Sequence, residues 1–384
     1  MTNKMILNGT AYFGFGSREK LIDEINVRGY KNILLVSDKG LVKAGVTKMV
    51  STLLDKAKIN YTLFTGVEPN PSIENVEDGV SVAVDNEVDA IVAVGGGSVI
   101  DASKAIAIII ANPEFSDVRS LDGVSPTKNK CLPIIAIPTT AGTAAEVTIN
   151  YVISDNENKK KMVCVDPHDI PEVSIIDTEL MSKMPASLAA ATGMDALTHA
   201  MEGYITKGSF LMSDMFHINA MALIYKNLDA FVNNKDLEAL ERVAYGEYIA
   251  GMGFSNSGLG IVHSLAHSLG SFAHIPHGEA CAVMLPHVLK FNGKVAVDAY
   301  KDMGCSFGFD MNNLSDDEVI KRIVDAVREL SIKVGIKQTL KELGVDKDLI
   351  PDMAKMALND ICTGGNPREV TLDDLINLYL ETYE

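Results

Sequence analysis

The chain has 384 residues and is acidic, with 34 Lys and Arg against 51 Asp and Glu and a formal net charge of −17. This balance excludes a nucleic-acid or anionic-membrane binding role, because both need basic patches. The length predicts two domains. The five cysteines are scattered and contain no Cys-x-x-Cys, which favours reduced thiols and a cytoplasmic location over a disulfide framework. No apolar run is long enough to span a membrane.

The N-terminus carries a turn signal, Asn8-Gly9, between the apolar runs 5–7 and 11–13. Asn-Gly in this setting predicts a β-hairpin over residues 5–14. A terminal hairpin leaves a strand edge that must be covered or paired. We therefore expect a homodimer, with packing of the hairpin onto its own sheet as the alternative.

Helical and strand patterns alternate from Ser17 to Asp177. The predicted strands are continuously apolar, as expected when helices cover both faces of a parallel sheet. The alternation predicts an α/β fold, with a Rossmann-like, doubly wound parallel-sheet domain over residues 1–184. The main strands are expected at 32–37, 61–64, 89–94 and 133–137.

Strand signals stop after Asp177, and helical periodicity takes over. Ser315 and Glu318 form a capping box ahead of one such helix, and Gly335 ends it. The pattern predicts an all-helical C-terminal domain over residues 185–384. Its helices are expected at 186–205, 209–231, 236–253, 259–270, 315–334 and 348–359.

Four of the eight histidines fall between Gly260 and Gly278. His263 and His267 are one turn apart on a helix that we expect to end at Gly270. Pro276 places His277 near the start of a second helix.

A second pair, Asp195 and His199, has the same one-turn spacing on the predicted helix 186–205. One carboxylate with several imidazoles suits Fe(II) or Zn(II) better than Mg(II) or Ca(II). Either pair alone is as readily explained by a buried Asp–His hydrogen bond or a packed imidazole. The two pairs together with His277, in a chain poor in histidine, favour a divalent-metal site.

Glycines and a serine, Gly95 to Ser98, join a predicted strand to a helix. Glycines let a phosphate approach the backbone, and a helix N-terminus offers free N–H groups. A tight turn without a ligand explains the same residues. Asp101 reads as a residue favoured by the helix dipole.

Two further positions fit a dinucleotide. Asp38 follows a predicted strand, where a carboxylate can bind an adenosine ribose and repel a 2′-phosphate. Thr139, Thr140 and Thr143 follow another strand, at the carboxyl edge where such sheets bind ligands. Helix capping is the alternative for Asp38 and for the threonine turn.

The stretch Gly-x2-His-x2-Ala-His-x2-Gly-x5-Pro-His-Gly resembles the metal-site signature of the iron-containing (group III) alcohol dehydrogenases. The likeness covers essentially the whole chain and implies a dehydroquinate synthase-like fold. It implies that His267 is no ligand but lies between metal and nicotinamide, and that His274 is an extra imidazole able to compete. The ligands that it implies are Asp195, His199, His263 and His277.

The resemblance also implies NAD(H) as cofactor and Fe(II) as metal, with Zn(II) as the alternative. Asp38 would go with NAD preference, and the glycine turn would hold the pyrophosphate. The cofactor residues that it implies are Asp38, Asn70, Gly96, Gly97, Ser98, Thr139, Thr140, Thr143, Asn150, Val152 and Lys161.

The implied reaction is hydride transfer to a carbonyl polarised by the metal. His267 either relays a proton or is a packed histidine. Phe254, Leu259 and Cys362, with Asn150, would line a small pocket, and segments 113–121, 163–171 and 362–369 imply reduction of lactaldehyde to 1,2-propanediol. Ethanol, butanol or another diol is the nearest alternative. A metal-dependent hydrolase or lyase and a metal-buffering protein are alternatives of other classes.

Overall fold

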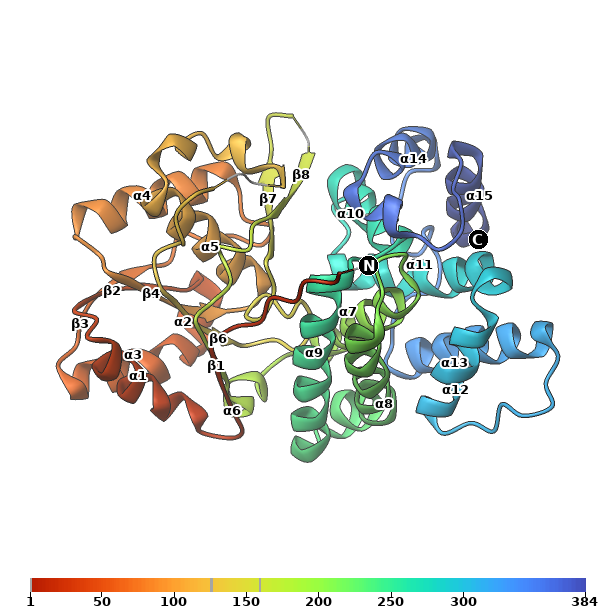
Figure 1. Cartoon of the computed structure of the whole chain (residues 1–384), viewed down its shortest axis with the longest axis horizontal. Helices are drawn as coiled ribbons and strands as arrows, with labels where there is room; N and C mark the ends of the chain where they lie inside the picture. The colour runs from red at the N-terminus through yellow and green to blue at the C-terminus, as the bar shows by residue number, and fades with distance from the viewer. Residues whose placement is uncertain (1, 125–126, 159) are drawn as a thin grey trace. The chain divides into compact units, whose positions relative to one another are not determined.

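The computed structural model describes residues 2–124, 127–158 and 160–384, which form two compact units (Figure 1). The sheet unit comprises Ile6–Thr140 and Ala144–Lys183. The helical unit comprises residues 2–5, Ala141–Thr143 and Met184–Glu384. The domain limits expected from the sequence, 1–184 and 185–384, stay a prediction. No helix in the described part of the chain has the length and apolarity that crossing a membrane requires.

A six-stranded sheet forms the centre of the sheet unit. Its strands run in the order β1-β9-β6-β4-β2-β3, and each pair of neighbours is parallel. The predicted α/β fold with a parallel sheet is thus confirmed. The strands are β1 Thr10–Phe13, β2 Asn32–Val36, β3 Asn60–Phe64, β4 Ala90–Gly95, β6 Ile134–Pro138 and β9 Val173–Ile176.

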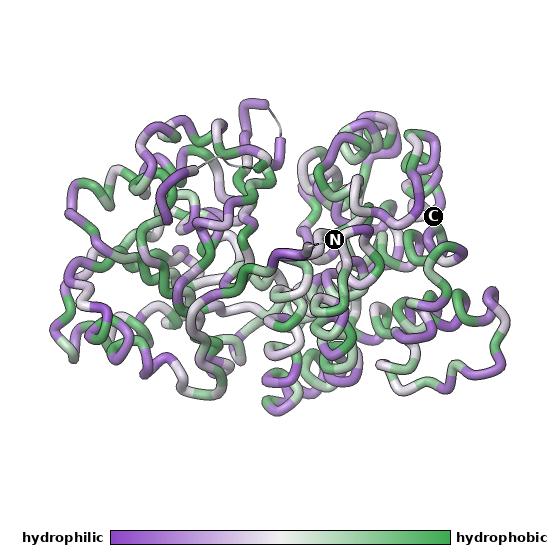
Figure 2. Tube along the Cα trace, in the orientation of Figure 1, coloured by the Kyte–Doolittle hydropathy of each residue, from purple (hydrophilic) through white to green (hydrophobic). Residues whose placement is uncertain are grey.

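Both faces of this sheet are buried, which explains the continuously apolar strands. In β2, Leu34 packs in a core with helices α4 and α5, whereas Leu35 packs on the other face with α1 and α3. Hydrophobic stretches accordingly run through the interior of each unit in Figure 2. The helices are α1 Lys20–Arg28, α2 Lys39–Ala44, α3 Val46–Ala57, α4 Ile73–Asp85, α5 Gly97–Ala111 and α6 Thr178–Met181.

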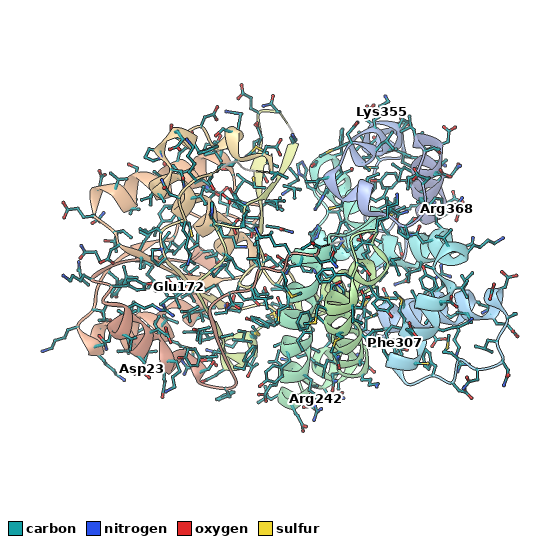
Figure 3. All side chains as sticks on the ribbon, in the orientation of Figure 1. Asp23, Glu172, Arg242, Phe307, Lys355 and Arg368 are labelled. Atoms are coloured by element: carbon teal, nitrogen blue, oxygen red, sulfur yellow. The ribbon has the colours of Figure 1, made fainter. Side chains whose placement is uncertain are left out.

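The predicted hairpin over residues 5–14 is wrong. β1 instead pairs in parallel with β9, and its Thr10 N–H donates to the backbone carbonyl of Glu172, a residue labelled in Figure 3, at 3.2 Å. The Asn8 amide donates to Ser174 Oγ at 2.9 Å. Asn8-Gly9 therefore ties the chain to β9, because residues 5–7 form no strand that could pair back.

A small second sheet lies outside the predicted strands. β7 Asn150–Asp155 and β8 Lys160–Val165 form an antiparallel hairpin, and β5 Gly123–Val124 adds to β8. The strands combine charged and apolar residues in short runs, so they lack the continuous apolar pattern of the main sheet.

The helical unit contains helices only, within the residues that the structure describes. Glu318 accepts from the Ser315 N–H at 2.8 Å, as the predicted capping box requires, and Gly335 follows the helix with a positive φ. The helices are α7 Ala186–Ile205, α8 Leu211–Asn234, α9 Leu237–Ser257, α10 Ile261–Ala273, α11 His277–Asn292, α12 Val297–Phe307, α13 Asp316–Lys333, α14 Ile350–Leu358 and α15 Leu372–Tyr383.

The prediction that Gly270 ends its helix is wrong. α10 continues to Ala273 and ends where His274 adopts the left-handed conformation, with φ 56°. Glycine inside a helix costs only about 1 kcal/mol relative to alanine, which packing can override.

Helices α7, α8 and α9 pack around a buried histidine. His217 of α8 lies against Gly203 of α7 and Gly253 of α9, where a Cβ would come within 2.3 Å and 2.4 Å of its Cε1 atom. Its Nε2 lies 3.2 Å from Ser257 Oγ. Burial lowers the pKa of His217 to about 3, because an imidazolium would lose its hydration there.

This pKa makes His217 a source of acid sensitivity. The unfolded imidazole titrates near pH 6.5, so between pH 6.5 and about 3 the unfolded chain binds a proton that the folded chain does not. Stability from this group is therefore lost as the pH falls. We expect His217→Gln to show a smaller drop in the urea midpoint of unfolding between pH 7 and pH 4 than the wild type. His274→Gln, at an exposed histidine, is the control, and an unchanged drop in His217→Gln would contradict the expectation.

Candidate active site

The four residues proposed as metal ligands meet in the helical unit. Asp195 and His199 come from successive turns of α7, His263 from α10, and His277 is the first residue of α11. Each offers one ligand atom, and these atoms all lie within 4.8 Å of one another. The two residues spaced one turn apart on α7 therefore form one compact cluster with His263 and His277.

The Asp195 carboxylate is the centre of this cluster. Its Oδ1 atom lies 3.4 Å from His277 Nε2 and 3.9 Å from His263 Nε2. Asp195 Oδ1 and His263 Nε2 are buried and have no hydrogen-bond partner among the residues that the structure describes. Burial raises the pKa of Asp195 to about 8 and lowers the pKa of His263 to about 3, since both charged forms lose their hydration.

A divalent cation fits this donor set. It would satisfy the two unpartnered atoms at once and compensate the buried carboxylate charge. Three imidazoles with one carboxylate form a set that both Fe(II) and Zn(II) accept.

Close packing of two helices brings His277 to the cluster. Gly278 follows it, and a Cβ at that position would lie 2.3 Å from the backbone carbonyl oxygen of Ala191 on α7. Only glycine lets α11 begin this close to α7. Pro276 is the residue immediately before α11, and its ring fixes the direction in which the chain enters the helix.

Two of the cluster's imidazoles are held at their Nδ1 atoms. His199 Nδ1 lies 3.2 Å from the Gly142 carbonyl oxygen, and His263 Nδ1 lies 2.6 Å from Glu202 Oε2. An oxygen acceptor at Nδ1 requires the N–H there, which leaves Nε2 as the free donor for a metal. Sequence reasoning missed Glu202, although it lies seven residues after Asp195 and so on the same helical face.

His267 lies beside the cluster and is held by a carboxylate of its own. Its Nδ1 is 2.8 Å from Asp360 Oδ2, and its ring stacks on His277 with centroids 5.4 Å apart. Although burial raises the pKa of Asp360, the neighbouring His267 brings it down to about 2. No sequence signal pointed to Asp360, because it is 93 residues from its partner.

His274, the extra imidazole in the stretch, is exposed at the C-terminal end of α10 and is not among the four clustered residues. Its left-handed backbone belongs to the helix end.

The predicted pocket residues of the helical unit have different neighbours. The Phe254 ring stacks on His199, with centroids 4.2 Å apart and an interplanar angle of 11°. Cys362 groups with His267 and Asp360, each within 4.8 Å of the others. Leu259 is buried in the connection from α9 to α10, immediately before Gly260.

The predicted nucleotide-binding residues lie mainly in the sheet unit. Gly96, Gly97 and Ser98 form the turn from β4 into α5, and no side chain caps the helix there. A Cβ at Gly96 would lie 3.1 Å from Thr140 Oγ1, so the glycine turn closely approaches the end of β6. A helix start without a side-chain cap can offer backbone N–H groups to an anion.

Asp38 follows β2 and the threonine turn follows β6, the two strands on either side of β4. Asp38 Oδ1 accepts from the Leu41 N–H at 2.8 Å and caps α2, the alternative role noted from the sequence. β2, β4 and β6 are adjacent and parallel, so Asp38, the glycine turn and Thr139 share the carboxyl edge of the sheet. Thr143, by contrast, packs with the helical unit.

The small second sheet carries the remaining cofactor candidates. Lys161 Nζ donates to Asn70 Oδ1 at 2.7 Å and to Ser154 Oγ at 3.0 Å. Burial lowers the pKa of Lys161 to about 8. Val152 N–H donates to Asp101 at 3.0 Å, so Asp101 ties α5 to β7, where Asn150 also lies. The prediction that Asp101 only interacts with the helix dipole did not include this hydrogen bond to Val152.

Two family models match the chain. The one described as iron-containing alcohol dehydrogenase matches residues 8–178, and the one described as Fe-containing alcohol dehydrogenase family, C-terminal, matches residues 189–383. Together they span most of both units.

Individual proteins show the same likeness. Lactaldehyde reductase of Escherichia coli (strain K12) is 51% identical over 379 residues, which cover 99% of each chain. A crystal structure of 1,3-propanediol oxidoreductase has a TM-score of 0.96 and 38% identity over 100% of both chains. Sulfoacetaldehyde reductase from Bifidobacterium kashiwanohense, in complex with NAD+, has a TM-score of 0.88 and 29% identity over 100% of this chain and 99% of that one.

Two substitutions test whether His277 or His274 is the fourth metal ligand. We expect His277→Ala to lose most bound divalent metal, because its Nε2 faces Asp195, whereas His274→Ala should keep it. Elemental analysis of proteins purified without chelator measures both. Full metal content in His277→Ala together with loss in His274→Ala would show that the wrong imidazole was chosen.

Proposed function

Because the chain belongs to the iron-containing alcohol dehydrogenase family, we propose that it is an NAD(H)- and metal-dependent enzyme that reduces lactaldehyde to 1,2-propanediol. In the reverse direction it would oxidise short diols and primary alcohols. The observation that carries the proposal is a buried pair of atoms in the four-residue cluster, Asp195 Oδ1 and His263 Nε2, which have no hydrogen-bond partner within residues 2–124, 127–158 and 160–384. Family membership favours this oxidoreductase over a hydrolase, a lyase or a metal-buffering protein.

The proposed metal ligands are Asp195, His199, His263 and His277, and the proposed metal is Fe(II). A bound divalent cation supplies Lewis acidity toward the carbonyl group of the substrate. The chain's own contribution is a largely buried cluster with one carboxylate, which leaves a net charge of +1 when a divalent cation is present. Phe254, stacked on His199, keeps that imidazole in place and excludes water from its face.

His267 is the proposed proton donor and acceptor. Asp360 accepts from its Nδ1, so the second ring nitrogen, Nε2, is the atom at which a proton can be exchanged. The Asp360 carboxylate lies 2.8 Å from Nδ1 and fixes the orientation of the ring. This arrangement resembles the orienting role that a buried aspartate has in other acid–base pairs.

The proposed NAD(H) site uses the carboxyl edge of the sheet. The N–H groups at the start of α5 would bind the pyrophosphate, and Asp38 would accept hydrogen bonds from the adenosine ribose. The remaining proposed contacts come from Asn70, Thr139, Thr140, Thr143, Asn150, Val152 and Lys161.

A homodimer in the cytoplasm is also part of the proposal. β1 is an edge strand, and Phe15, just beyond it, is 62% exposed. Edge strands are prone to pair with a second chain. The five free cysteines agree with a reducing compartment. A single-chain mass in solution would count against the dimer.

Asp38 predicts a preference for NADH over NADPH, because a 2′-phosphate would meet a like charge. We expect Asp38→Gly to narrow this preference markedly, and glycine at a helix cap costs only a few tenths of a kcal/mol. The control is Asp236→Gly, which removes the equivalent cap from α9 and should leave the preference unchanged. The measurement is kcat/KM for both cofactors at saturating aldehyde. Equal use of both by the wild type would leave Asp38 as a cap only.

The substrate proposal rests on a small pocket that includes Phe254, Leu259 and Cys362. Each methylene that does not fit costs about 1–3 kcal/mol in such a pocket. We therefore expect kcat/KM to fall by roughly 10–200-fold for each methylene by which the aldehyde exceeds the pocket. Leu259→Ala should improve long aldehydes more than short ones. Leu240→Ala, another buried leucine of the helical unit, should lower stability without changing that ratio.

The measurement is kcat/KM with NADH over aldehydes of two to six carbons, with and without a 2-hydroxyl group. Activity on short aldehydes with lactaldehyde ahead of butyraldehyde would support the proposal. A large preference for butyraldehyde would keep the dehydrogenase and refute lactaldehyde as the substrate.

A further inference from the structure

We propose that Glu202 is a positioning residue of the metal site: it locks His263 so that Nε2 faces Asp195, and its negative charge strengthens His263 as a ligand. This inference rests on the proposed function, because it takes His263 to be a metal ligand. Glu202 itself would not bind the metal, since it lies on the opposite ring nitrogen.

Glu202 lies on the same face of α7 as two proposed ligands. It follows His199 by three residues and Asp195 by seven, which is two turns of an α-helix. Its side chain is 3% exposed. Burying a carboxylate is costly unless several donors surround it, so the neighbours of Glu202 indicate why it is there.

Three donors from α10 surround this carboxylate. Glu202 Oε1 accepts from the Val262 N–H at 2.7 Å, and Oε2 accepts from the His263 N–H at 3.3 Å and from His263 Nδ1 at 2.6 Å. Among the described residues, His263 is the only partner with which Glu202 forms an ion pair. Both oxygens are therefore committed to one helix and to one imidazole.

The start of α10 is shaped to admit this carboxylate. The residue before the helix, Gly260, has no side chain to cap it, and a Cβ there would lie 2.8 Å from Glu202 Oε1. Glu202 thus replaces a local cap and meets the positive end of the helix dipole. Because the backbone and the ring of His263 are bound to the same carboxylate, the imidazole cannot turn away from Asp195.

His199, His263 and His267 each have an oxygen acceptor at Nδ1, and these acceptors differ in charge. His199 has the neutral Gly142 carbonyl oxygen at 3.2 Å, and His267 has Asp360 at 2.8 Å but lies outside the four-residue cluster. Glu202 is the carboxylate bound at Nδ1 of a clustered residue. An anionic acceptor at Nδ1 raises the basicity of Nε2, and loss of such a partner typically costs 10–100-fold in metal affinity.

The experiment compares Zn(II) affinity, by competition with a chelator, in the wild type and Glu202→Gln. The amide keeps the size but cannot accept from all three donors, so we expect affinity to fall 10–100-fold. Two controls should keep wild-type affinity. Asp236→Asn removes a capping carboxylate from α9, and Asp177→Asn removes a buried capping carboxylate from the sheet unit.

A second readout separates positioning from simple capping. With Co(II) in the site, the visible absorption reports the ligand geometry, so Glu202→Gln should change the spectrum while circular dichroism shows an intact fold without metal. If Glu202→Gln does not fold, Glu202→Asp takes its place, because the shorter side chain cannot reach both the helix N–H groups and the imidazole.

The outcomes are distinguishable. Wild-type affinity and spectrum in a folded Glu202 variant would overturn the role of Glu202 while leaving the metal site intact. Equal losses of affinity in Glu202→Gln and both controls would also overturn it, because the effect would then be general. A wild-type protein that binds neither Zn(II) nor Co(II) would instead refute the proposed function and the inference with it.

Discussion

The proposed metal site depends on a carboxylate and an imidazole that face each other inside the helical unit without forming a hydrogen bond. Asp195 Oδ1 and His263 Nε2 are buried and 3.9 Å apart, and neither has a hydrogen-bond partner in the described part of the chain. Buried polar atoms are nearly always hydrogen-bonded, and leaving one unpaired costs about 1–3 kcal/mol. Two such atoms aimed at one point, with two more imidazoles around them, are unfavourable as a purely structural core. A cation at that point would bind both atoms and so remove the cost of leaving them without a partner.

Several features of the helical unit serve to hold this arrangement. α7 supplies two of the four residues and also Glu202, which fixes a third from the start of α10. Gly278 lets α11 begin against α7, and Gly142 brings a carbonyl group to His199. The short segment Ala141–Thr143 thus belongs with the helices although it follows a strand of the sheet unit. His199 and His263 are oriented from outside the cluster, through Gly142 and Glu202, so that their Nε2 atoms can face it.

The sequence predicted what depends on local spacing and missed what depends on distant contacts. The one-turn pairs Asp195–His199 and His263–His267 and the buried strands follow from helical and strand periodicity, and the structure contains them. Asn8-Gly9 failed as a hairpin signal because its partner is β9, more than 160 residues away. Asp360 was missed for the same reason, and the short strands β7 and β8 lack a continuous apolar pattern. Glu202 carried a readable signal, its place on the ligand face of α7, which the histidine pattern overshadowed.

The central claim, that one divalent cation is held by Asp195, His199, His263 and His277, is tested most directly by anomalous X-ray diffraction. Crystals of protein purified without chelator would be measured on both sides of the iron and zinc absorption edges. We expect one strong peak at about 2.0–2.2 Å from a ligand atom of each of the four residues. No peak in the helical unit, or a peak at His267, Asp360 and Cys362 instead, would contradict it.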